Sequence, residues 1–279
     1  MIRRVARVFR RGLWKISSKF KKRVPVYIPV LSSELLKGRT ALITGGTSGI
    51  GYEIAKVFLS SGARVVITGR TQGRVDEAAR TLGKECVGVV LDNLKVDLFA
   101  ERLEIVRKKV GEIDVLVNNA GLLGDSSFGF VSKDSFEAIM DTNLRGPFML
   151  SQVVAKDWIQ KKIHGNILNV CSSSSFRPGD SPYALSKWGL RSMTLGLAKR
   201  LIPYGIVVNG IAPGPTATDG FGREIDGAID WSKNPQGRLV TPVEVANLSV
   251  ILVSGLGRAV VGDVLCVSGG AGLVTFDDI

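Results

Sequence analysis

Tyr183 and Lys187 are four residues apart in the stretch "SPYALSKWG", whose pattern predicts the start of a helix. Residues at this spacing share one helix face, so the lysine ammonium can lie close to the phenol. A nearby cation stabilises the phenolate, which makes the tyrosine a better proton donor or acceptor near neutral pH. The pair therefore predicts general acid–base chemistry, although the same spacing by itself is typical of surface helix pairs.

A glycine-rich stretch, "TGGTSGIG" at residues 44–51, follows an apolar run and leads into the helical pattern "IGYEIAKVFLSSG". Glycines at such a turn let backbone N–H groups and the helix N-terminus approach a pyrophosphate without a Cβ in the way. The spacing of Gly45, Gly49 and Gly51 differs from the common G-x-G-x-x-G. A structural loop is the alternative, but a position directly after the first strand favours a dinucleotide site.

Seven apolar runs rich in β-branched residues alternate with helical periodicity from residue 37 onward. The elements that they predict must position the Tyr183–Lys187 pair and the glycine-rich stretch. The runs are "TALIT", "ARVVIT", "CVGVVL", "DVLVNN", "NILNVC", "IVVNGIAP" and "VVGDVLCV". They predict an α/β fold of the Rossmann type, with a doubly wound parallel sheet of about seven strands and helices on both faces. We expect one such domain, residues 38–279, with ligands bound beyond the carboxyl ends of the strands.

Six motifs together resemble the single-domain branch of the short-chain dehydrogenase/reductase family. They are T-G-x-x-x-G-x-G, "NNAG" at 118–121, "DTNLRGPF", "NILNVCSS" with "YALSK", and "NGIAPGPTAT". The resemblance covers about residues 38–273, in the family's order and near its usual spacings. It implies an oxidoreductase that transfers hydride between a nicotinamide cofactor and a carbonyl or alcohol substrate.

The resemblance also implies which residues are catalytic: Tyr183, Lys187, Ser172 and Asn143. Lys187 would bind the nicotinamide ribose, and Asn143 would anchor a water that connects the lysine to solvent. The serine is ambiguous, because Cys171 takes the place of the family's first serine and the usual following glycine is missing, with Ser175 nearest its place. The interval from Ser172 to Tyr183 is also slightly short, so Ser173 remains an alternative.

The adenosine end of the expected site indicates the cofactor. At the end of the second strand, Gly69 occupies the place where an acid would favour NAD(H), and Arg70 follows it. A guanidinium can bind a 2′-phosphate through two hydrogen bonds, so NADP(H) is preferred and NAD(H) stays open, since Ser48 replaces a second basic residue. Taken with the glycine turn and Arg70, the family resemblance implies these cofactor-binding residues: Gly45, Thr47, Ser48, Gly49, Ile50, Arg70, Asp92, Asn93, Asn118, Ala120, Gly121, Tyr183, Lys187, Pro213, Gly214 and Thr216.

The segment "DGFGREIDGAIDWSKNPQGR" at 219–238 predicts a mobile cover whose apolar underside carries Phe221, Ile225, Ile229 and Trp231, and the resemblance implies that it closes over the substrate. Three further residues could either face the pocket or lie on the surface: Arg177, Trp188 and Arg223. No charge cluster identifies the substrate beyond a small carbonyl or alcohol compound. The separated cysteines and the lone His164 predict no metal site and a cytoplasmic, reducing compartment.

The net charge of +12 is concentrated in residues 1–37, which hold eleven basic residues and one acid. Residues 1–20 form a basic amphipathic pattern, too interrupted by arginines to span a bilayer. Contact of residues 1–24 with an anionic membrane surface is one interpretation; a disordered basic tail or an organelle presequence is the other. The body is nearly neutral, which argues against nucleic-acid binding.

The leading hypothesis is therefore an NADP(H)-dependent carbonyl reductase, reversible in principle. One alternative is a non-catalytic NADP-binding sensor or scaffold recruited through the basic arm. Another is a sugar-nucleotide epimerase or dehydratase, for which a different glycine spacing and a larger C-terminal region would be expected. The final strand resembles the region through which family members associate, and this implies a homodimer or homotetramer.

Overall fold

The chain divides into two units, residues 1–31 and residues 32–279. The computed structural model describes residues 32–124, 128–218 and 229–273, all within the second unit. The predicted basic arm, and the cover residues Phe221, Arg223 and Ile225, lie outside the described residues. Leu36, which precedes the domain start expected at residue 38, is fully buried in the core.

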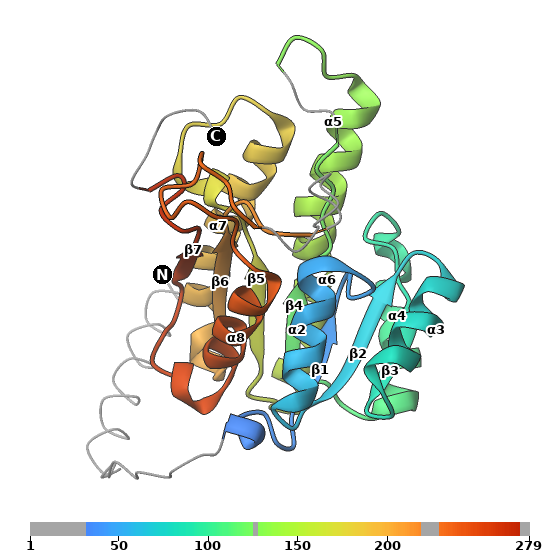
Figure 1. Ribbon diagram of the computed structural model, residues 1–279. Helices are drawn as coiled ribbons and strands as arrows, with labels where there is room; N and C mark the ends of the chain where they lie inside the picture. Colours follow the sequence, from blue (N-terminus) through green and yellow to red (C-terminus); the bar gives the residue numbers. More distant parts are fainter. Residues whose placement is uncertain (1–31, 125–127, 219–228, 274–279) are drawn as a thin grey trace, which may run out of the picture. The chain divides into compact units, whose positions relative to one another are not determined.

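Seven parallel strands form one sheet in the order β3-β2-β1-β4-β5-β6-β7 (Figure 1). This arrangement confirms the predicted doubly wound parallel sheet. The order reverses direction between β1 and β4, which is where ligands bind in folds of this kind. The strands are β1 (Thr40–Ile43), β2 (Arg64–Gly69), β3 (Cys86–Val90), β4 (Val115–Asn118), β5 (Asn166–Val170), β6 (Val207–Pro213) and β7 (Val264–Val267).

Helices cover both faces of the sheet, and α2 and α8 lie side by side (Figure 1). Successive strand residues point to opposite faces, so Ala41 and Ile43 pack with α2, α3 and α8, whereas Leu42 packs with α4, α6 and α7. Both faces are therefore dry, which explains the nearly continuous apolar strands. The helices are α2 (Gly49–Ser60), α3 (Gln72–Leu82), α4 (Phe99–Val110), α5 (Lys133–Met140), α6 (Gly146–Lys161), α7 (Pro182–Leu201) and α8 (Pro242–Val253).

Two short helical segments prepare the site. A π-helical turn, η3 (Asp141–Arg145), joins α5 to α6, and a 3₁₀ turn, η4 (Ser173–Phe176), follows β5. Within the described ranges, no helix combines the length and apolar character that a bilayer crossing requires.

Candidate active site

A cavity of about 1280 Å³ lies beyond the carboxyl ends of the strands. Turns that follow β1 to β6 contribute to its wall, and α7 contributes Tyr183, Ala184 and Lys187. The predicted cofactor-binding positions that line it are Gly45, Thr47, Ser48, Gly49, Ile50, Arg70, Asp92, Asn93, Ala120, Gly121, Tyr183, Lys187, Pro213, Gly214 and Thr216. Residues more than 160 positions apart in sequence are thus brought to one cavity.

The glycine turn between β1 and α2 depends on the absence of a side chain at Gly45. Gly45 has a φ of +65°, and a Cβ on it would lie 2.9 Å from the Cα of Ala120. Gly49, which begins α2, has a φ of +57°. The Ser48 side chain makes no capping hydrogen bond, so the first N–H groups of α2 remain available to an anion. The turn therefore fits a pyrophosphate.

A second turn, after β4, locks the glycine turn in place. The Asn119 amide donates to the carbonyl oxygens of Thr44 (2.9 Å) and Gly45 (3.1 Å). The Thr44 hydroxyl oxygen accepts the backbone N–H groups of Asn119 (3.0 Å) and Ala120 (3.1 Å). The two turns form one hydrogen-bonded unit along the cavity.

Asn118, expected along the cavity, has its side chain in the core. Its amide nitrogen donates to the Ser151 hydroxyl at 2.9 Å and to the side-chain oxygen Oδ1 of Asn169 at 2.8 Å. Asn119, which the sequence analysis did not select, lines the cavity instead. The signal was the alternation of strand residues, which sends adjacent asparagines to different sides.

Two arginines line the end of the cavity at which the sequence predicts the adenosine. Arg70 and Arg74 are both exposed and both line the cavity, on either side of the start of α3. Within the described part of the chain, neither guanidinium pairs with a carboxylate. The Thr71 side chain makes no capping hydrogen bond to α3, so a second helix N-terminus faces this end uncapped. Arg74 was missed, although its spacing of four from Arg70 at a helix start would have indicated it.

Tyr183 and Lys187 share one face of α7, as their spacing predicts. Helix α7 begins at Pro182, and the Ser181 hydroxyl caps it by accepting the Ala184 N–H at 3.2 Å. The Lys187 ammonium lies 5.7 Å from the centre of the Tyr183 ring. It donates to the Val170 carbonyl oxygen at 2.8 Å, and the lysine is only 5% exposed. An ammonium keeps two further donors in this position, so it can serve the cavity as well.

Asn143 lies in the π-helical turn and is fully buried. Its amide nitrogen donates to the Leu122 carbonyl oxygen (2.9 Å) and to the Ser186 hydroxyl (3.1 Å), and its oxygen accepts the Leu122 N–H (2.7 Å). A Cβ on Gly121 would lie 3.6 Å from the Asn143 oxygen and 3.7 Å from the Lys187 nitrogen. The two groups therefore flank one space beside the cavity wall.

The serine turn after β5 brings Cys171, Ser172, Ser173 and Ser174 to the cavity, but not Ser175. The Ser172 hydroxyl accepts the Ser174 N–H at 3.1 Å and caps η4. Ser175 is fully buried; its N–H and its hydroxyl both donate to the Ser172 carbonyl oxygen, at 2.9 and 2.6 Å. Burial raises the pKa of the Cys171 thiol to about 11, so this residue stays neutral in the wall.

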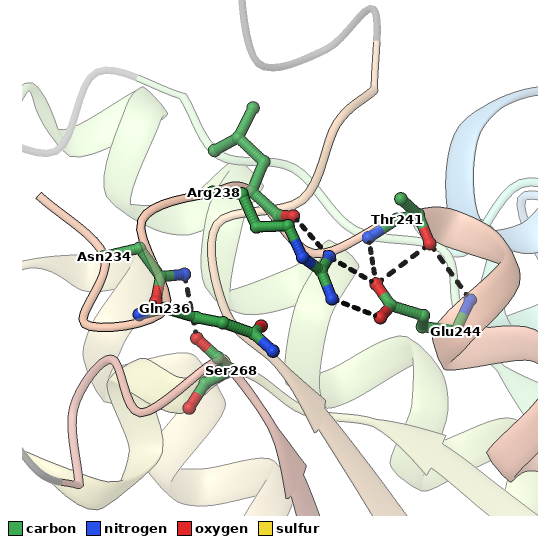
Figure 2. A network of polar contacts seen from close by, with 7 residues as sticks. Asn234, Gln236, Arg238, Thr241, Glu244 and Ser268 are labelled. Atoms are coloured by element: carbon green, nitrogen blue, oxygen red, sulfur yellow. Dashed lines mark hydrogen bonds and ion pairs between the residues drawn. The ribbon is translucent and has the colours of Figure 1, made fainter. Parts of the chain in front are cut away.

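The described part of the cover, residues 229–238, is anchored at Asn234 and at Arg238 (Figure 2). The Asn234 amide donates to the Ser268 carbonyl oxygen at 3.0 Å. The Arg238 guanidinium binds both carboxylate oxygens of Glu244, at 2.7 and 3.0 Å, and Thr241 completes a capping box for α8. Hydrogen bonds from Arg238 lower the pKa of Glu244 to about 2.

The remaining substrate-side residues fall into two groups. Trp231, from the described end of the cover, and Arg177, from the end of the serine turn, line the cavity. Ile229, within the cover, is half-buried and is not among the residues that line the cavity. Trp188 lies outside the cavity wall, and its indole N–H donates to the Arg177 carbonyl oxygen at 2.8 Å.

Known proteins share this fold and much of the sequence. A 3-oxoacyl-[acyl-carrier-protein] reductase FabG from Aquifex aeolicus is 35% identical over 84% of this chain and 98% of its own length. Gluconate 5-dehydrogenase from Gluconobacter oxydans is 33% identical over 84% of this chain and 95% of its own. The crystal structure of a 3-ketoacyl-(acyl-carrier-protein) reductase from Brucella melitensis complexed with NADH superposes with a TM-score of 0.78 at 30% identity, covering 85% and 99% of the two chains.

The family model described as short chain dehydrogenase matches residues 39–227, which include the glycine turn, Asn143, the serine turn and the Tyr183–Lys187 pair. The chain belongs to the short-chain dehydrogenase family.

Proposed function

We propose that the protein is an NADP(H)-dependent oxidoreductase that interconverts a carbonyl compound and the corresponding alcohol. One observation carries the proposal: the anion-binding glycine turn and the Tyr183–Lys187 pair line the same cavity. A site for a dinucleotide and a site for proton exchange thus lie within reach of one substrate. When bound, the nicotinamide supplies hydride to the carbonyl carbon or accepts it from the alcohol.

Tyr183 gives its proton to the substrate oxygen as the carbonyl is reduced, and it takes the proton back in the reverse reaction. The Lys187 ammonium, held by the Val170 carbonyl oxygen, stabilises the phenolate that Tyr183 becomes. The Ser172 hydroxyl holds and polarises the substrate oxygen, and Ser173 is its alternative. Asn143 keeps the turn after β4 in register with α7, where a water relay to Lys187 would run.

NADP(H) is favoured by charge and by space. Arg70, Arg74 and the start of α3 supply two guanidinium groups and helix N–H groups for a 2′-phosphate. A Cβ on Gly69 would lie 2.9 Å from a methyl carbon of Thr47 and 3.0 Å from one of Val75. An acidic side chain at this position, which would select the free ribose hydroxyl, would therefore require Thr47 and Val75 to shift.

The substrate is assigned only as a carbonyl or alcohol compound. The relatives' names mention a 3-oxoacyl group on a carrier protein and gluconate, which are different compounds. These names support the reaction class but do not agree on a substrate. Substrate specificity would then be set by residues that line the cavity, such as Arg177 and Trp231.

The test is replacement of Tyr183 by phenylalanine, assayed by NADPH absorbance with a panel of aldehydes and ketones. We expect kcat to fall by about 10²–10⁴-fold, because the proton donor is lost, with little change in the Kd for NADPH. Turnover that survives the substitution would overturn the role of Tyr183. Binding of NADPH by the unaltered protein without turnover of any panel member would favour the sensor alternative.

A separate proposal concerns the basic arm, which rests on sequence alone. Residues 1–24 would bind an anionic membrane surface through their cationic and apolar faces. Deletion of these residues should weaken sedimentation with anionic vesicles and leave turnover of a soluble substrate nearly unchanged. Equal vesicle binding by the two forms would contradict this role.

A further inference from the structure

Two residues one turn apart on α7, Trp188 and Arg191, contact the serine turn at residues 175–177. The Arg191 guanidinium donates to the Ser175 carbonyl oxygen at 2.9 Å and lies with its central carbon 4.0 Å from the centre of the Phe176 ring. The same carbon lies 5.4 Å from the Trp188 ring, whose N–H donates to the Arg177 carbonyl oxygen at 2.8 Å. Three consecutive residues of the turn, 175–177, are therefore bound by two residues of one helix.

These contacts continue to Ser172. The N–H and the hydroxyl of Ser175 both donate to the Ser172 carbonyl oxygen, so whatever fixes Ser175 also fixes the backbone at Ser172. The Ser172 hydroxyl is held in turn by the Ser174 N–H within the same turn. A continuous path of hydrogen bonds thus joins Arg191 to the residue whose hydroxyl lines the cavity.

The helix that holds the turn also carries Tyr183. We propose that Arg191, assisted by Trp188, is a positioning residue that sets the Ser172 hydroxyl relative to the Tyr183 phenol. The inference rests on the proposed function, because both groups must meet one substrate oxygen. We call the contacts of Arg191 and Trp188 with residues 175–177 the clamp. Misplacement of a reacting group by about 1 Å can cost 100-fold in rate, so loss of the clamp should lower kcat.

Arginine suits this position for two reasons. Its planar guanidinium can stack on an aromatic ring and donate to a carbonyl in the same geometry, whereas a lysine ammonium is a single point charge. The turn also lacks the glycine that the family resemblance leads one to expect, and the buried Ser175 lies nearest that place. The contacts of Arg191 and Trp188 therefore fix the conformation of the serine turn, which has no local glycine motif to do so.

The experiment compares Arg191→Met and Arg191→Lys in the unaltered protein and in a Ser172→Ala background. Arg200→Met is the matched control, because Arg200 is an exposed arginine on the same helix and makes no ion pair among the described residues. Each protein is assayed for kcat, KM, NADPH affinity and thermal midpoint.

We expect Arg191→Met to lower kcat by about 10- to 100-fold with unchanged NADPH affinity, and Arg191→Lys to recover part of the loss. In the Ser172→Ala background, Arg191→Met should change kcat by less than about 2-fold, because the group it positions is absent. Equal losses in both backgrounds, or a kcat unchanged by Arg191→Met, would overturn the inference.

Amide hydrogen exchange of residues 172–177 provides a readout that needs no turnover. Arg191→Met should speed exchange at these residues and leave the glycine turn unchanged, whereas unaltered exchange would overturn the clamp. If the unaltered protein reduces no carbonyl compound, the proposed function fails, and the exchange measurement still decides whether Arg191 holds the turn.

Discussion

The two ends of the cavity are built by different means. At the cofactor end, the turn after β1 is shaped by glycines that exclude side chains and by backbone hydrogen bonds to the turn after β4. At the proposed substrate end, the serine turn (residues 171–177) contains no glycine and is held by side chains from α7. The shape of the glycine turn can be recognised from the residue types within the turn itself. The shape of the serine turn depends on contacts with residues that are distant in the sequence.

The largest effect should come from the substrate end. Ser172→Ala should lower kcat by about 10²–10³-fold, because the donor to the substrate oxygen is lost. Ser173→Ala is the matched control and should have a much smaller effect. Steady-state assays decide the assignment, and the opposite order of effects would give the role to Ser173.

A smaller effect is expected from the charges at the cofactor end. Arg70→Gln should weaken NADPH binding by about 10- to 100-fold, the value of a charge-assisted hydrogen bond, and leave NADH binding nearly unchanged. Arg74→Gln should act in the same direction. Fluorescence titration with each nucleotide measures both constants, and parallel weakening of NADPH and NADH would contradict 2′-phosphate recognition.

The backbone at the cofactor end can be tested with two glycines. Gly45→Ala should destabilise the fold by about 1–2 kcal/mol, because its φ is positive, and should also weaken NADPH binding, since the new Cβ meets Ala120. Gly73→Ala, in α3 with open space around it, should instead stabilise the fold by up to about 1 kcal/mol. Urea unfolding compares the two, and a neutral Gly45→Ala would show that this end tolerates side chains.

The smallest effect concerns the anchor of the cover. Arg238→Gln should cost less than about 1 kcal/mol of stability, because Glu244 is 39% exposed and the pair is partly screened. The folded pKa of Glu244, about 2, lies below its ordinary 4.5, so the carboxylate contributes stability above about pH 4.5 that is lost as the pH falls through 2. The difference between the two proteins should therefore close on acidification. Urea unfolding at several pH values measures the free energy of unfolding of the unaltered protein and of Arg238→Gln. A difference between them that does not change with pH would contradict a stabilising Arg238–Glu244 ion pair.

The contrast between the two ends also explains what could be predicted. The seven strands, the glycine turn and the Tyr183–Lys187 pair follow from patterns within a few residues, and the structure places them as expected. Prediction of Asn119 and Arg74 would have required one further step. That step is to work out which side chains face the cavity at the end of β4 and at the start of α3. The clamp at Arg191 joins residues 16 positions apart through a tertiary contact, and no local pattern specifies it.

The crowding around Gly69 limits how the nucleotide preference of this chain can be altered. An acidic residue installed there would begin within 3.0 Å of a methyl carbon of Thr47 and one of Val75, so both side chains would have to shift. Val75 is a buried residue of α3, so its displacement would cost stability. A switch toward NAD(H) is therefore easier to reach by removing the arginines than by adding an acid.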